Sequence, residues 1–286
     1  MSLRAQVPPV HLVKRVWERI APLQLADRSW DNVGIMMGKC CVLPDGPIAY
    51  LSQSLLYRLT TAVCNEALAL PSCSVVVSYH PPIFRGLKSM TLSDPLQASL
   101  LRLSARGISV FSPHTSLDAT PNGINAWLVK PFLNIAASSG PITTSEPVEG
   151  FEGAGMGRII QLMERMPVSK IVQIVKEHLS LQHVQLATPD INKPIESIAV
   201  CAGSGGSLFK GVKADLLLTG ELSHHEVLAA VAAGQSVILC NHSNTERPYL
   251  SAVLREWLQN ELNAEQGEQG WEVLVSKMDA DPLRTV

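Results

Sequence analysis

The sequence predicts an α/β protein made of two similar halves with mainly parallel sheets. Short apolar runs rich in β-branched residues, typical of strands buried on both faces, alternate with segments of helical period. This alternation has the rhythm of βαβ units. The same pattern occurs before and after residues 138–157, a stretch rich in glycine, proline and serine that we interpret as a linker.

The first half, residues 1–137, is expected to begin with an amphipathic helix. One face of this helix carries only apolar residues: Val10, Val13, Val16, Trp17 and Ile20. A polar turn follows, in which Asp31 and Asn32 can bond nearby backbone amides, and it leads into a short apolar strand. Further strands are expected at residues 48–52, 74–78 and 108–112, and helices at residues 55–70, 95–106 and 122–130.

The second half, residues 158–286, repeats this organisation. Strands are expected at residues 158–162, 183–188, 195–200, 215–219, 236–240 and 271–276. Helices are expected at residues 167–179, after residue 223 as far as Ala233, and at residues 247–262. The two halves are alike in architecture, although no repeat is visible at the level of residues.

Length and composition limit the function classes. The chain has 286 residues, of which 46% are hydrophobic, enough for one large or two medium domains with a substantial core. A formal net charge of −2 gives no bulk attraction to nucleic acid or to an anionic membrane, so neither is expected as a direct partner. No apolar run approaches the ~18 residues that a membrane span needs.

The cysteines and the N-terminus bear on localisation. The six cysteines form no C-x-x-C pair, and four of them lie in apolar segments, as reduced buried cysteines do. We therefore expect a cytoplasmic protein, with a mitochondrial or nuclear location left open. The amphipathic, arginine-bearing start resembles a mitochondrial presequence, but Glu18, Pro8 and Pro9 favour an ordinary first helix.

Acidic and imidazole side chains follow four of the predicted strands. His80 ends one strand, His114 and Asp118 follow another, Glu221 and His224 follow a third, and His242 and Glu246 follow a fourth. In open α/β sheets, ligands bind outside the carboxyl ends of the strands. Each residue alone is more simply a capping, core or surface residue, but agreement at four strand ends favours a site for Zn²⁺, Fe²⁺ or Mn²⁺.

The pair His242 and Glu246 follows the apolar run at residues 236–240. The two residues are four apart, so they share a face if the turn continues into a helix. Spacing alone fits a surface contact better than a pair of metal ligands. The acidic and imidazole residues at the other strand ends favour the interpretation of His242 and Glu246 as metal ligands.

A glycine-rich loop at residues 201–207 allows two interpretations. Successive backbone amides there could hold an anion, or the loop could simply be a tight turn after a strand. The loop lacks the lysine of the G-x-x-x-x-G-K-[ST] motif, which disfavours a P-loop nucleotidase.

Five motifs occur together and in order along the chain: Trp30-Asp31-Asn32-Val33-Gly34, Tyr79-His80-Pro81-Pro82, His114-Thr115-x-x-Asp118, Thr219-Gly220-Glu221 and His242-x-x-Thr245-Glu246-Arg247. With them the chain resembles the Nif-three-like family, the GTP cyclohydrolase 1 type 2 homologues, and most of all its animal branch. The resemblance spans nearly the whole chain. It implies a central cleft between the two halves and a hexamer built as a trimer of dimers.

The resemblance also implies a two-metal centre. His80 and Asp118 would bind the first metal, His242 the second, and Glu246 would bridge them. Family members have two adjacent histidines before the proline, and in this chain Tyr79 replaces the first. Because neutral tyrosine is a poor ligand, we expect one divalent metal site and an incomplete second one. Many relatives also insert a small domain where this chain has only residues 138–157.

These features predict a metal-dependent hydrolase that acts on a nucleotide or related small molecule. A metal held by His80, Asp118 and Glu246 would lower the pKa of its water, with His114 or Glu221 as general acid or base. The alternative is a non-catalytic interaction protein with a partial metal site and protein partners in transcriptional regulation, as the resemblance to the animal branch implies. A metal-storage or metal-delivery scaffold would use the same residues without turnover.

Overall fold

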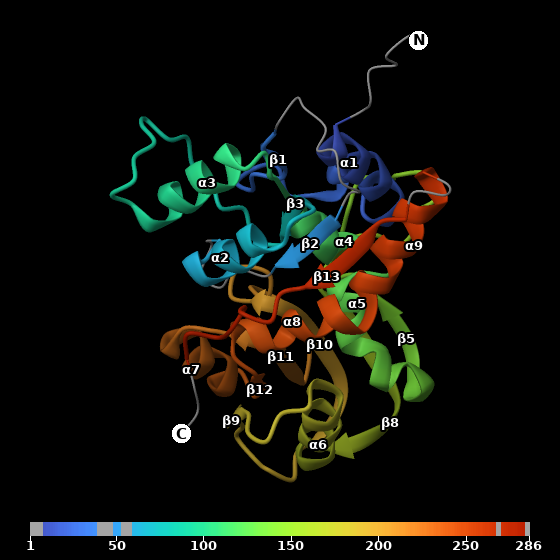
Figure 1. Cartoon of the computed structure of the whole chain (residues 1–286). Coiled ribbons are helices and arrows are strands. Elements are labelled where there is room, and N and C mark those ends of the chain that lie inside the picture. Colours follow the sequence, from blue (N-terminus) through green and yellow to red (C-terminus); the bar gives the residue numbers. More distant parts are fainter. Residues whose placement is uncertain (1–7, 39–47, 53–58, 267–269, 284–286) are drawn as a thin grey trace, which may run out of the picture. The chain divides into compact units, whose positions relative to one another are not determined.

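The structure is a computed structural model of the chain, and it describes residues 8–38, 48–52, 59–266 and 270–283. Contacts divide the chain into two compact units. Unit 1 comprises residues 1–117 and 250–284, and unit 2 comprises residues 118–249 with the last two residues. Each unit contains several helices and one large sheet, which confirms the predicted α/β class (Figure 1).

The sheet of unit 1 is mainly parallel, as predicted. Its strands, in sheet order, are β1 (Gly34–Met37), β4 (Ser109–Ser112), β3 (Cys73–Ser78), β2 (Ile48–Ser52) and β13 (Glu272–Val275). Only the β1–β4 pair is antiparallel. Every residue of β3 is buried, as expected of a central strand covered on both faces.

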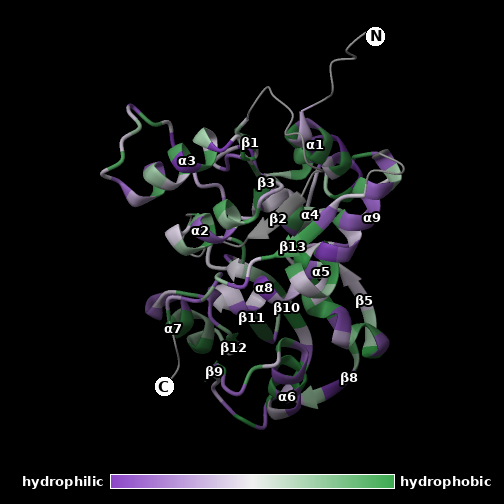
Figure 2. Ribbon diagram, viewed as in Figure 1, coloured by the Kyte–Doolittle hydropathy of each residue, from purple (hydrophilic) through white to green (hydrophobic). Residues whose placement is uncertain are grey.

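The helices of unit 1 begin where local sequence favours a helix start. They are α1 (Pro9–Ile20), α2 (Thr61–Ala69), α3 (Pro95–Ala105), and α9 (Arg255–Gln266) after a π-helical stretch at Leu250–Leu254. Thr60 caps α2 by accepting from the amide of Val63 at 3.2 Å, and Asp94 caps α3 with proline at the first helical position. The apolar face predicted for α1 is buried, and Figure 2 shows hydrophobic and hydrophilic residues mixed along this helix.

The sheet of unit 2 is mixed rather than mainly parallel. Its strands, in sheet order, are β5 (Ala136–Gly140), β8 (Arg158–Pro167), β10 (Pro194–Ser204), β11 (Leu216–Glu221), β12 (Ser236–Leu239) and β9 (Gln185–Ala187). Only the β10–β11 and β11–β12 pairs are parallel. Strands β5 and β8 pair antiparallel with each other, β8 pairs antiparallel with β10, and β9 pairs antiparallel with β12.

The helices of unit 2 are α4 (Thr115–Ala119, which straddles the unit boundary), α5 (Ile124–Val129), α6 (Val168–Leu179), α7 (His224–Ala232) and the short α8 (Arg247–Tyr249). Helices α5, α6 and α7 lie in predicted helical segments, whereas the sequence predicts no helix at α4, and α8 is only the start of the helix predicted at residues 247–262. A capping box formed by Ser223 and Glu226 starts α7, directly after β11. Within the described residues, every helix is too short or too polar to cross a lipid bilayer.

The units differ from the two predicted halves in their boundaries. Residues 250–284 belong to unit 1, because β13 extends the first sheet by pairing in parallel with β2 (Figure 1). Helix α9 also packs on α1, where Arg19 contacts Glu261 at 2.8 Å and Arg15 contacts Glu265 at 3.0 Å. The segment predicted to close the second half therefore completes the first.

The stretch at residues 138–157 is structured rather than a plain linker. It contains the end of β5 and the two short strands β6 (Thr143–Thr144) and β7 (Gly155–Met156), which pair with each other. Gly155 has a φ of +157°, and a Cβ there would collide with the backbone of Thr143. The glycines that suggested irregular chain instead permit this tight pairing.

Candidate metal centre

The three parallel strands of unit 2 bring three predicted site segments to one edge of the sheet. Strand β10 ends at Ser204, β11 at Glu221 and β12 at Leu239, shortly before His242. Because these neighbouring strands run in the same direction, their carboxyl ends and the loops that follow them lie side by side. The loop around Gly203, the Thr219-Gly220-Glu221 motif and the His242–Glu246 segment consequently meet.

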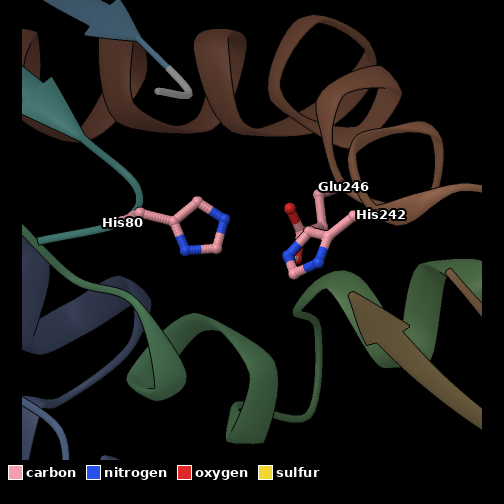
Figure 3. A group of neighbouring side chains, drawn as sticks. All are labelled: His80, His242 and Glu246. Atoms are coloured by element: carbon pink, nitrogen blue, oxygen red, sulfur yellow. Dashed lines mark ion pairs between the residues drawn. The ribbon is translucent and has the colours of Figure 1, made fainter. Parts of the chain in front are cut away.

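His242 and Glu246 form the pair at the centre of this edge. Nε2 of His242 lies 3.2 Å from Oε1 of Glu246 (Figure 3). The side chain of Glu246 is 3% exposed and that of His242 is 16% exposed. The predicted proximity is confirmed, although the segment His242–Thr245 is a 3-10 turn and only Arg247–Tyr249 continues as α-helix.

Glu221 contacts the other ring nitrogen of His242. Its Oε1 lies 2.9 Å from Nδ1, so the imidazole is held between two carboxylates. Burial alone would lower the pKa of His242, but Glu246 and then Glu221 outweigh burial and raise the pKa to about 10. The side chain of Glu221 is 53% exposed, which leaves this carboxylate in contact with solvent.

Backbone and hydroxyl contacts fix the loops around this pair. The hydroxyl of Thr245 donates to the carbonyl of His242 at 2.7 Å and accepts from the amide of Gly203 at 2.8 Å. Asn241 has a φ of +67°, a strained conformation for a non-glycine residue, directly before His242. Gly220 has no room for a side chain, because a Cβ would lie 2.7 Å from Cα of His242.

Gly203 lies directly against the His242–Glu246 pair. With a φ of +63°, it adopts a conformation that favours glycine, and a Cβ on it would lie 2.5 Å from Oε1 of Glu246. A side chain at residue 203 would therefore collide with both donor atoms. The imidazole and carboxylate of this pair are donor types that bind divalent cations.

Asp118 belongs to the same unit and is half-buried in α4. Burial raises the pKa of the Cys201 thiol, and the negative charges of Asp118 and Glu246 raise it further. Both carboxylates therefore act on a single side chain at the end of β10.

Unit 1 places His80 and His114 together. His80 follows β3 and is 3% exposed, and its Nδ1 lies 3.2 Å from Nε2 of His114, which follows β4. Asp31 contacts the other nitrogen of His114, with 2.7 Å between its Oδ1 and Nδ1. Tyr79 is buried and packs edge-on against both imidazole rings. His80 is drawn in Figure 3 as the labelled side chain from unit 1.

The glycine-rich loop is a tight turn rather than an anion cradle. The amide of Gly203 donates to Thr245, and the amide of Gly205 donates to the carbonyl of Glu221 at 3.4 Å. A Cβ on Gly206 would collide with the carboxylate of Glu226, so an acid already occupies this side of the loop. Turns rather than a helix follow the loop, so it does not lead into a helix N-terminus that could hold an anion.

Sequence reasoning missed three residues of these clusters. The sequence predicts a turn role for Asp31, although its carboxylate contacts His114, and it predicts no role at the pair for Gly203 or Thr245. Asp31 and Thr245 lie inside the motifs, next to acidic and imidazole residues, and this position is the sequence feature that could indicate their role. His224, which was grouped with Glu221, is instead the exposed first residue of α7.

Comparisons with known proteins agree with the motif resemblance. A family model described as Duf34/NIF3 (NGG1p interacting factor 3) matches residues 9–282. The protein NIF3 homolog of Schizosaccharomyces pombe is 43% identical, over 96% of this chain and 97% of that protein. NGG1-interacting factor 3 of Saccharomyces cerevisiae is 39% identical, over 92% of each chain. NIF3-like protein 1 of Drosophila melanogaster is 38% identical, over 94% of this chain and 86% of that protein.

Solved structures show the same fold. A hypothetical protein of Staphylococcus aureus has a TM-score of 0.78 and 22% identity, covering 98% of this chain and 100% of that chain. A Bacillus cereus protein related to NIF3 has a TM-score of 0.77 and 16% identity, covering 96% of this chain and 98% of that chain. The sequence identity to the two fungal relatives, 43% and 39%, is at least as high as the 38% identity to the Drosophila melanogaster relative, which represents the animal branch that the motifs suggested.

Proposed function

Because the chain belongs to the Duf34/NIF3 family, we propose that it binds one divalent metal ion through His80, His242 and Glu246, with Asp118 as a further ligand. The observation that carries this proposal is the His242–Glu246 pair, whose donor atoms lie 3.2 Å apart and whose side chains are 16% and 3% exposed. Imidazole and carboxylate donors suit Zn²⁺, Fe²⁺ or Mn²⁺.

The chain's own chemistry supports one metal rather than two. Tyr79 stands where the family pattern has a histidine, and a neutral phenol is a poor ligand for a second ion. The four proposed ligands, at residues 80, 118 and 242–246, come from both predicted halves of the chain. The central cleft between these halves is therefore part of the proposal.

We propose further that the metal serves hydrolysis of a nucleotide or related small molecule. When bound, a divalent metal ion supplies Lewis-acid chemistry that lowers the pKa of water. Glu221 is the acid–base residue of this proposal, because its carboxylate is both exposed to solvent and hydrogen-bonded to His242. His114, the other predicted acid–base residue, has hydrogen-bond partners at both ring nitrogens, which favours a supporting role.

A second function is favoured by the name of one relative. The Saccharomyces cerevisiae protein, 39% identical to this chain, is called NGG1-interacting factor 3. The alternative proposal is therefore a non-catalytic protein that binds a protein partner in transcriptional regulation and retains a partial metal site. In both proposals the chain assembles as a hexamer, a trimer of dimers, and acts in the cytoplasm, mitochondrion or nucleus.

Elemental analysis of the protein purified without added metal tests the metal site. About one metal ion per chain is expected in the wild type, with strong loss in Asp118→Ala and Glu246→Ala. Glu149→Ala, which removes an exposed carboxylate, is the matched control and is expected to keep the metal. Wild-type protein without stoichiometric metal would overturn the metal proposal, and equal retention in all variants would overturn the ligand assignment.

A panel of nucleotides and phosphoesters then separates the two functions. Turnover by the metal-loaded wild type and none by Glu221→Gln supports the hydrolase, since the amide keeps the size of Glu221 but cannot carry a proton. Metal-loaded protein that turns over no member of the panel supports the non-catalytic alternative.

A further inference from the structure

Three side chains of unit 1 form a series of hydrogen bonds that ends at the proposed ligand His80. Asp31 lies in the turn before β1, His114 follows β4 and His80 follows β3, and these three strands are neighbours in the sheet. Oδ1 of Asp31 lies 2.7 Å from Nδ1 of His114, and Nε2 of His114 lies 3.2 Å from Nδ1 of His80. Asp31 thus reaches His80 through a single imidazole ring.

The carboxylate of Asp31, at one end of this series of hydrogen bonds, acts as a hydrogen-bond acceptor. Its other oxygen, Oδ2, accepts from the amide of Thr115 at 3.2 Å and from the Thr115 hydroxyl at 2.5 Å. Burial alone would raise the pKa of Asp31, but His114 and Thr115 outweigh burial and lower the pKa below its ordinary value. An ionised carboxylate only accepts hydrogen bonds, so Nδ1 of His114 carries the proton between them.

The middle ring is fixed in place. His114 has a φ of +36°, unusual for a residue other than glycine, and its amide donates to the carbonyl of Tyr79 at 3.1 Å. The side chain of His114 is 7% exposed and that of Asp31 is fully buried. Trp30 packs edge-on against the His114 ring, with 5.8 Å between centroids. These contacts oppose rotation of the imidazole away from Asp31.

When both imidazoles are neutral, the positions of the protons along these hydrogen bonds determine the tautomer of His80. A neutral imidazole with its proton on Nδ1 has an acceptor at Nε2, so His114 accepts from His80 at that atom. Nδ1 of His80 must then carry a proton, which places the lone pair of the ring on Nε2. The opposite order would set Nδ1 of His114 as an acceptor against a carboxylate oxygen 2.7 Å away, which is repulsive.

We propose that Asp31, acting through His114, is a positioning residue that sets His80 in the tautomer whose metal-binding atom is Nε2. The ligand part of this inference rests on the proposed metal site, whereas the tautomer is a property of the metal-free protein. Hydrogen-bonded partners of this kind orient metal-binding histidines in many proteins.

Asp31→Asn is the informative substitution, because it keeps the size of the side chain and reverses the hydrogen-bond order. An amide group can donate to Nδ1 of His114, which moves the His114 proton to Nε2 and makes Nδ1 of His80 the acceptor. His80 then carries its proton on Nε2. The matched control is Asp27→Asn, which removes a neighbouring carboxylate bonded to Ser29 and Trp30 rather than to a histidine.

Nitrogen-15 NMR of histidine-labelled, metal-free protein reads the tautomer directly, and His80→Gln assigns the signals. We expect a protonated Nδ1 and an unprotonated Nε2 for His80 in the wild type and in Asp27→Asn. The pattern is expected to invert in Asp31→Asn and to recover in Asp31→Glu. Wild-type protein with a protonated Nε2 on His80 overturns the inference, even if Asp31→Asn does not fold.

Calorimetric titration with Zn²⁺ gives the second readout. Asp31→Asn is expected to bind Zn²⁺ roughly 10- to 100-fold more weakly than the wild type and Asp27→Asn. Unchanged Zn²⁺ affinity in Asp31→Asn overturns the positioning role. If the wild type binds no Zn²⁺, the proposed metal site fails, and the NMR pattern still decides the tautomer of His80 independently.

Discussion

Gly203 lies so close to Glu246 that a Cβ on the glycine would be 2.5 Å from Oε1 of the carboxylate. The same Cβ would lie 2.9 Å from Nε2 of His242. A methyl group at residue 203 would therefore collide with both proposed donor atoms. This contact joins the end of β10 to the segment after β12, within unit 2.

Gly203→Ala is expected to abolish stoichiometric metal binding, because the new methyl group displaces the donor atoms. Gly234→Ala is the matched control: its φ of +82° imposes similar strain, about 1–2 kcal/mol, but a Cβ there meets nothing within 4 Å. Metal content and thermal unfolding of both variants separate the two effects. Equal metal content in the two variants would contradict the assignment of His242 and Glu246, which contact Gly203, as metal ligands.

Metal binding is expected to release a proton and to strengthen as pH rises. Burial alone would lower the pKa of His242, but Glu246 and Glu221 outweigh it and raise the pKa to about 10, so near neutral pH the metal must displace a proton from this ring. Apparent affinity for Mn²⁺ should rise roughly tenfold per pH unit between about pH 6 and about pH 8. Calorimetry in buffers of different ionisation enthalpy measures the released proton, and an affinity independent of pH would contradict the displacement.

Asp215 is expected to contribute stability that is lost in acid. Burial alone would raise the pKa of Asp215, but the amides of Glu196 and Ser197, at 2.9 and 3.1 Å, outweigh it and lower the pKa. A lowered pKa in the folded state gives stability that is present above the unfolded value of 3.8 and is lost as pH falls through the folded value.

Asp215→Asn should therefore cost about 1–2 kcal/mol of unfolding free energy at neutral pH and less in acid. Urea unfolding at several pH values measures the difference. Asp190→Asn, at an exposed carboxylate that accepts from one amide, is the control and should show a smaller cost. A loss of unfolding free energy in Asp215→Asn that grows as pH falls would contradict this prediction.

Arg158 is expected to be a major contributor to the stability of unit 2. The residue is 4% exposed, and its guanidinium donates to the carbonyls of Gly155 and Gly157 at 2.7 Å and to that of Thr120 at 3.2 Å. Arg158→Met removes these donors and leaves three carbonyls without them, which should cost roughly 3 kcal/mol.

Arg165→Met provides a control with the same substitution on the same strand. Arg165 is 66% exposed and forms a surface ion pair with Glu196 at 2.8 Å, which should be worth less than ~1 kcal/mol. Chemical unfolding of both variants measures the two costs. A similar loss of stability in both would show that the buried carbonyl contacts of Arg158 contribute little.

The sequence by itself determined most of the secondary structure and half of the candidate site. Strand β3 and helix α1 followed from local patterns, because an unbroken β-branched run and a helical stripe of apolar residues each require burial of a specific kind. The His242–Glu246 contact followed from spacing alone, since residues four apart remain close in a 3-10 turn as well as in an α-helix.

Only the tertiary structure decided which sheet each segment joins and which groups support the site residues. Strand β13 carries no local signal that it pairs with β2, more than 200 residues earlier in the chain, because pairing depends on backbone hydrogen bonds between segments. Asp31 likewise has the sequence signature of a turn, and only the neighbouring positions of β1 and β4 bring its carboxylate to His114. Contacts between residues far apart in sequence arise from packing, which the order of residues along one segment does not encode.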